Sequence, residues 1–109
     1  MSVYRFKSRE TGDLVMLQQH GQRMLEILGK RLTGPGIIQP SEMDAAVQKI
    51  RAAVAADDAA RQKQKEKAEE DGHHDDAQTD PVSLRMRAAP FIEMLERCEK
   101  ANVEIVWGV

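Results

Sequence analysis

A polar stretch from Asp57 to Asp80 limits, more than any other feature, how this chain can fold. Its apolar side chains are all alanines, and nine acidic residues against four basic ones give it a net charge of −5. Such a segment cannot bury enough surface to offset the entropy lost on ordering. We therefore expect a single domain over residues 1–109 with a disordered polar insert over residues 57–80. Its first part is rich in helix formers and can extend the preceding helix into solvent, with order ending near Gly72.

Both ends of the chain carry strand patterns. Tyr4 and Phe6 fall on one face of residues 3–7, which predicts a half-buried strand. The apolar run Leu14–Leu17 fits either a second strand or the first turn of a helix; we favour the strand, which would complete a hairpin. Residues 103–109 alternate in part and predict a third strand. The predicted fold class is α+β, with a small antiparallel or mixed three-stranded sheet and about three helices packed on it.

Two of these helices precede the insert. The first runs through residues 17–28 and ends at Gly29, a residue that favours helix C-termini. After a loop at 33–36, Ile37 and Ile38 are expected to enter the core. The second helix is predicted to begin from a Ser41 cap and to bury an apolar stripe over residues 43–54.

The third helix follows the insert. Thr79 or Asp80 is the expected cap, with Pro81 in the first helical position. Apolar residues then recur at helical spacing up to Cys98, and Asn102 is expected to end the helix in the left-handed conformation. Pro90 lies inside this pattern, where it removes a backbone donor and should kink the helix or split it in two.

Composition excludes several classes of protein. Only 4% of residues are aromatic, so the core must be mostly aliphatic and Met. The net charge of −2 leaves no global basic field, so nucleic acid is not an expected partner. The single cysteine permits no intrachain disulfide and fits a reducing compartment. No secretory signal and no stretch of about 20 apolar residues is present, so we expect a cytoplasmic location and no membrane partner.

No pattern in the sequence predicts a metal site or a cofactor. His73 and His74 lie among acidic residues and suit a transition metal, but a flexible linker without a closed ligand pattern favours plain solvation. His20 has no nucleophile or orienting partner that would mark it as a general base. Cys98 lies on the apolar side of its helix, which favours a core role over a reactive thiol near Arg97. We therefore expect no catalytic residue, no cofactor and no identifiable small-molecule substrate.

Two arginines are the candidate binding residues. Arg85 and Arg87, with other basic residues outside the insert, leave the rest of the chain at +3. If they converged they would be anion contacts, whereas scattered solvated charges are the favoured reading. The acidic insert could pair with the same surface and compete with a nucleic acid. Exposed edges of a small sheet would also favour dimerisation by strand pairing.

These observations favour a non-enzymatic protein-interaction or accessory module, with a protein partner or a homodimer as candidate assemblies. The alternative is a weak nucleic-acid or anionic-ligand binder that uses Arg85 and Arg87. An enzyme assembled from dispersed residues is the least favoured reading, because no catalytic pattern is visible.

Several segments together carry a resemblance to a known family. They are Tyr4-Arg5-Phe6-Lys7-Ser8, Asp13–Leu17, Met24–Gly29, Gly34-Pro35-Gly36-Ile37-Ile38 and Val82–Leu95. The chain, apart from its polar insert, resembles the small bacterial family catalogued as domain of unknown function 1840. The resemblance implies a compact domain found mostly in proteobacteria. It implies no activity, cofactor or catalytic residue.

Overall fold

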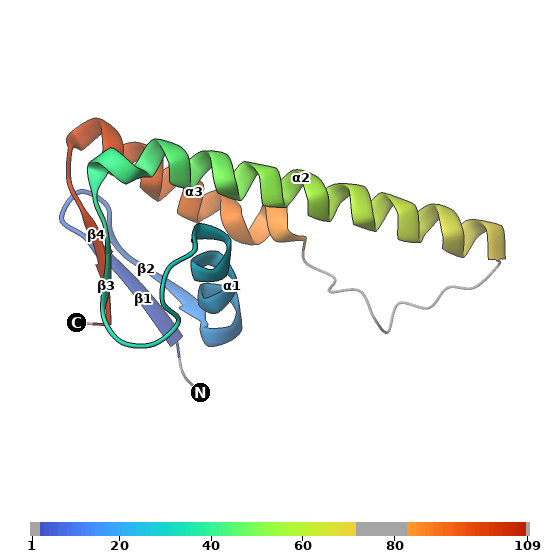
Figure 1. Ribbon diagram of the computed structural model, residues 1–109, viewed down its shortest axis with the longest axis horizontal. Helices are drawn as coiled ribbons and strands as arrows, with labels where there is room; N and C mark the ends of the chain where they lie inside the picture. The colour runs from blue at the N-terminus through green and yellow to red at the C-terminus, as the bar shows by residue number, and fades with distance from the viewer. Residues whose placement is uncertain (1–2, 72–82, 109) are drawn as a thin grey trace.

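The computed structural model describes residues 3–71 and 83–108, and its architecture is α+β. Three helices and four strands follow one another along the chain (Figure 1). In order they are β1 (Val3–Ser8), β2 (Gly12–Leu17), α1 (Gln18–Leu28), β3 (Gly36–Ile38), α2 (Pro40–Asp71), α3 (Leu84–Ala101) and β4 (Ile105–Trp107).

The four strands form one antiparallel sheet in the order β2-β1-β4-β3. The predicted hairpin is confirmed: β1 and β2 pair from Val3 opposite Leu17 to Ser8 opposite Gly12. Gly12 has a φ of 78°, which glycine adopts at the end of the tight connection without strain. Leu14–Leu17 is therefore strand, the favoured alternative.

The sheet has four strands rather than the predicted three. Gly36–Ile38 pairs with β4, where Ile38 lies opposite Ile105, so the two isoleucines lie in a strand and not in a loop. Ile38 is fully buried, as expected, but Ile37 is 39% exposed, so the expectation that both enter the core is wrong for Ile37. Successive side chains of a strand point to opposite faces of the sheet, so only one of the two can face the core. A strand of three residues is too short for alternation to be recognised, and the glycines before it predict only a turn.

The residues at the helix ends are of types that commonly cap helices, although α2 and α3 begin at other residues than predicted. Gly29 ends α1 in the left-handed conformation, as predicted. The predicted Ser41 cap is wrong, because α2 begins at Pro40. Proline suits the first helical position, and the Glu42 carboxylate accepts the backbone N–H of Gln39 at 2.9 Å. The Lys30 ammonium bonds the same carboxylate at 2.7 Å, and these two bonds hold the pKa of Glu42 below its ordinary value.

The third helix starts later than predicted and passes through its proline. It begins at Leu84, and the Ser83 hydroxyl caps it by accepting the N–H of Met86; the expected caps at Thr79 and Asp80 lie outside the described residues. Pro90 does not split α3, which continues to Ala101. Pro90 is on the exposed side, where water can satisfy the carbonyl of Met86 that lost its donor. Asn102 ends the helix in the left-handed conformation, as expected.

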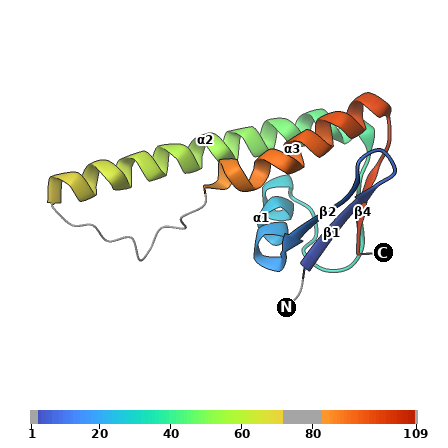
Figure 2. The same cartoon turned by 180° about the vertical axis from the view of Figure 1, so that it is seen from behind.

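All three helices lie on one face of the sheet, with α2 and α3 side by side and α1 between them and the hairpin (Figures 1 and 2). The core between the layers contains the aromatic side chains of Phe6, Phe91 and Trp107. The Phe6 ring lies 4.8 Å from Phe91 and 5.6 Å from Trp107, measured between centroids. No helix of the described residues covers the other face of the sheet (Figures 1 and 2).

The first part of the polar stretch is helical. α2 continues to Asp71 and extends past the start of α3 (Figure 1), as the helix-forming composition predicted. We expected disorder past Gly72, and that segment lies outside the described residues. His73 and His74 belong to the same segment.

Gly36 offers a test of how β3 and β4 fit together. A Cβ at this position would overlap the indole ring of Trp107, which is 1% exposed and cannot move aside easily. We expect Gly36→Ala to lower the free energy of unfolding by about 1–3 kcal/mol, the range for overpacking. Urea unfolding measures this, and the neighbouring Ile37→Ala, on the open side of the sheet, should change stability much less. Equal effects of the two substitutions would contradict the close packing.

Candidate interaction surface on α2 and α3

The third helix is apolar on two sides. Its core side carries Phe91, Leu95 and Cys98, all fully buried. A second set of apolar residues runs from its solvent side toward α2, and we call it the α3 strip: Met86, Ala89 and Ile92. Met86 is 66% exposed, and Ile92 is partly buried. A helix that only covers a core is polar on its solvent side, so the α3 strip is a candidate contact surface.

A groove between α2 and α3 includes two residues of the α3 strip, Ala89 and Ile92. Its volume is about 400 Å³, and its apolar floor is formed by Val54, Ala89 and Ile92. The charged side chains that line it are Arg51, Arg85, Glu93 and Glu96. An apolar centre inside a charged rim is the arrangement found at protein interfaces.

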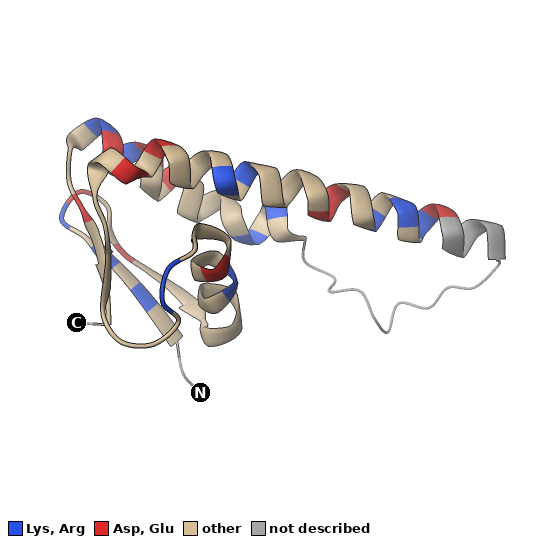
Figure 3. Cartoon of the chain, in the orientation of Figure 1, with Lys and Arg blue, Asp and Glu red and all other residues tan. Residues whose placement is uncertain are grey.

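Charges on this side of the molecule are paired between the two helices. Arg51 Nη2 lies 3.4 Å from Glu96 Oε2 at one end of the groove. Arg85 contacts Asp58 Oδ2 through both Nη2, at 2.6 Å, and Nε, at 3.1 Å. Basic and acidic positions are interspersed along both helices and do not gather into a single-sign patch (Figure 3). The rim therefore carries both signs close together.

The start of α3 is held to α2 by Asp57. Its Oδ2 accepts the backbone N–H of Leu84 at 3.1 Å and the Nε–H of Arg61 at 2.8 Å. Burial raises the pKa of Asp57, but the hydrogen bonds from Arg61 and Leu84 outweigh burial and hold the pKa below its ordinary value of 3.8. The carboxylate is thus a cap for a helix that starts 27 residues later in the chain.

The two candidate anion contacts are directed to different helices. Arg85 binds Asp58 on α2, whereas Arg87 donates from Nη1 to Nε2 of His20 on α1. Residues two apart on a helix lie on nearly opposite sides, so the two guanidinium groups do not face one site. His20 lies in the first turn of α1, and no pattern in the sequence predicts that it contacts Arg87.

Cys98 has the core role that the sequence predicted, and the aromatic residues of the sheet also pack in the core or against it. Cys98 is fully buried, and its thiol donates to the hydroxyl of Ser8 at 3.1 Å. Trp107 is also buried, and Tyr4 packs against the core while its hydroxyl donates to the carbonyl of Leu32.

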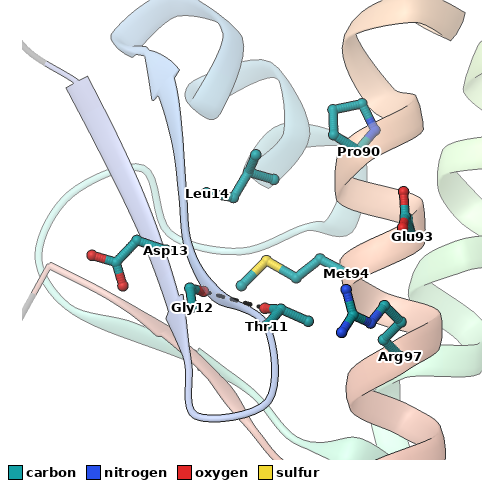
Figure 4. Close-up of a pocket in the computed structure, with 8 residues that line it drawn as sticks. All are labelled: Thr11, Gly12, Asp13, Leu14, Pro90, Glu93, Met94 and Arg97. Carbon is teal, nitrogen blue, oxygen red and sulfur yellow. Dashed lines mark hydrogen bonds between the residues drawn. The ribbon is translucent and has the colours of Figure 1, made fainter.

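A smaller pocket of about 190 Å³ lies between the hairpin and α3 (Figure 4). Met94 and Leu14 reach into it, and Glu93 and Arg97 line its α3 side. Asp13 points away from α3 and toward Arg5 on the open side of the sheet, at 3.8 Å. The pocket therefore does not bring two carboxylates together for acid–base chemistry.

Within residues 3–66 and 83–108, no three His, Cys, Asp or Glu side chains gather in a way that could hold a metal ion. No helix in the described ranges is both long and apolar enough to pass through a bilayer.

Asp57→Asn tests the cap at the start of α3. The amide loses the negative charge that Arg61 and the helix N-terminus favour, so we expect the free energy of unfolding at pH 7 to fall by about 1–2 kcal/mol. Urea unfolding measures this, with Asp44→Asn on the exposed side of α2 as the control. An Asp57 variant as stable as the wild type would contradict the cap.

The same substitution has a predicted pH dependence. Because the native pKa of Asp57 is below 3.8, the stabilisation is fully present above pH 3.8 and is lost as the pH falls through the lowered native value. The unfolding free energies of wild type and Asp57→Asn should therefore converge in acid. A difference between the two proteins that stays constant from pH 7 down to pH 2 would exclude this linkage.

Comparison with known proteins gives one result. No curated protein and no solved structure matches the chain. The family model described as Domain of unknown function (DUF1840) matches residues 2–107, which includes every described strand and helix. The chain therefore belongs to the DUF1840 family.

Proposed function

We propose that this protein is a non-enzymatic protein-interaction module that acts in the cytoplasm and docks a protein partner on the α3 strip and the adjoining groove. The observation that carries the proposal is the second apolar side of α3. Met86 is 66% exposed, and Ala89 and Ile92 continue from it into the groove floor. Covering these side chains with a partner would remove apolar surface from water, the main driving force of association.

The charged rim of the groove also supports a role in binding a protein. Arg51, Arg85 and Glu96 surround the apolar floor and would remain near the edge of an interface, where they select the partner. The buried thiol of Cys98 fits a protein of a reducing compartment.

The anionic-ligand alternative receives less support. Asp58 already supplies a carboxylate to Arg85, and Arg87 is engaged with His20 on a different helix. A phosphate would have to displace Asp58 to bind Arg85, and Arg51, the other arginine that lines the groove, is paired with Glu96.

Site-specific photo-crosslinking in cells tests the interaction surface. With p-benzoylphenylalanine in place of Ala89, on the groove floor, we expect a covalent adduct between this chain and a protein. The control places the same probe at Lys49, which lines a different pocket beside Leu28. Adducts at position 49 but not at position 89, or at neither, would contradict the proposal. The mass of the adduct identifies the partner.

A further inference from the structure

We infer that the partner that docks in the α2–α3 groove is a second copy of this chain, related to the first by a two-fold axis. This inference rests on the proposed function, because it takes the groove as a docking surface and names its occupant. It is drawn from the way the charges are arranged around the groove.

Arg51, Arg85 and Glu96 line the groove, and Asp58 pairs with Arg85 at its edge; we call these four residues the corners. Glu93 of α3 also lines the groove. On α2, Arg51 is positive and Asp58 is negative; on α3, Glu96 is negative and Arg85 is positive. Because the helices run antiparallel, Arg51 lies beside Glu96 at one end and Asp58 lies beside Arg85 at the other. The sign therefore alternates around the four corners.

Because the sign of the charge alternates around the four corners, this surface is electrostatically complementary to the same surface on a second copy. A two-fold axis parallel to the helices places α2 over α3 of the second copy, so that Arg51 faces Glu96 and Asp58 faces Arg85. A two-fold axis across the helices places α2 over α2 and α3 over α3, so that Arg51 faces Asp58 and Arg85 faces Glu96. In both arrangements every corner meets the opposite sign, as a symmetric interface requires of its own surface.

The corners remain available to a second copy although they are paired within one chain. Their side chains are 55% (Arg51), 54% (Glu96), 67% (Arg85) and 38% (Asp58) exposed. Exposed ion pairs of this kind contribute little to stability because solvent screens them, so sharing or exchanging partners across an interface costs little. Between the corners, Val54, Ala89 and Ile92 supply the apolar centre.

The contact is small, which favours a weak and reversible association. Arg51 and Asp58 are separated by seven residues, or about 10 Å along α2. A contact of two to three helical turns on each helix lies at the small end of protein interfaces. We therefore expect a reversible dimer with a dissociation constant in the micromolar range.

Charge reversal at the corners tests the dimer. The double variant Arg51→Glu, Arg85→Glu makes all four corners acidic, and Asp58→Lys, Glu96→Lys makes all four basic. We expect each variant alone to dimerise at least about tenfold more weakly than the wild type, because like charges then face each other. An equimolar mixture of the two should associate again, as a heterodimer. Sedimentation equilibrium measures all three, and circular dichroism shows that each variant is folded.

The control is Arg97→Glu, Lys100→Glu, which changes the net charge equally on exposed positions outside the groove and should dimerise like the wild type. If a double reversal does not fold, Ala89→Lys puts a charge on the groove floor from an exposed position and should abolish the dimer. A wild type that stays monomeric at every soluble concentration, variants that associate as it does, or a mixture that does not associate would each overturn the inference.

The crosslinking experiment separates the two proposals. An adduct of twice this chain's mass supports both of them. An adduct with a different protein, together with a monomeric purified chain, overturns the second copy and keeps the interaction module. Absence of both adduct and dimer overturns both.

Discussion

The carboxylate of Asp57 on α2 accepts a hydrogen bond from the first residue of α3, and it thereby joins two helices whose contact residues are 27 positions apart in the sequence. The first turn of a helix leaves backbone N–H groups without partners and carries a partial positive charge. Asp57 meets both needs of α3 at once, and Arg61, one turn further along α2, holds the carboxylate in place. The axial position of α3 decides where Phe91 enters the core and where Met86 and Ala89 meet solvent. This contact, together with the burial of Phe91, Leu95 and Cys98, therefore fixes which side of α3 enters the core and which side meets solvent.

Local patterns in the sequence were sufficient for much of the fold. The alternation around Tyr4 and Phe6, the turn before Gly12, and the left-handed ends at Gly29 and Asn102 each involve residues that are near neighbours in the chain. Cys98 could be placed in the core because helical spacing alone puts it among buried residues. The fourth strand could not, because three residues carry no period and β3 exists only by pairing with β4. The start of α3 was missed because its cap from Ser83 is supported by Asp57, far away in sequence.

The candidate surface also has features that local sequence predicts and features that depend on residues distant in the chain. Arg85 and Arg87 were recognisable as basic residues on a helix, but their partners, Asp58 and His20, come from two other helices. The alternation of charge around the groove depends on the antiparallel register of α2 and α3, which no spacing within either helix reveals. The exposed apolar residues of α3 were visible in the sequence as a broad apolar pattern, and the packing shows which of them the core does not use.

The order of the strands has a consequence for how the molecule reaches this structure. β4 lies between β1 and β3, and Lys7 pairs with Val106, so the middle of the sheet joins the two most distant elements of the described chain. The β1–β2 hairpin and the α2–α3 pair each close over shorter segments and can assemble early. The sheet is completed only when β4 is inserted between strands that have no contact before it arrives. Because loop closure over so long a segment is slow, we expect the insertion of β4 at the centre of the sheet to be a late event in folding.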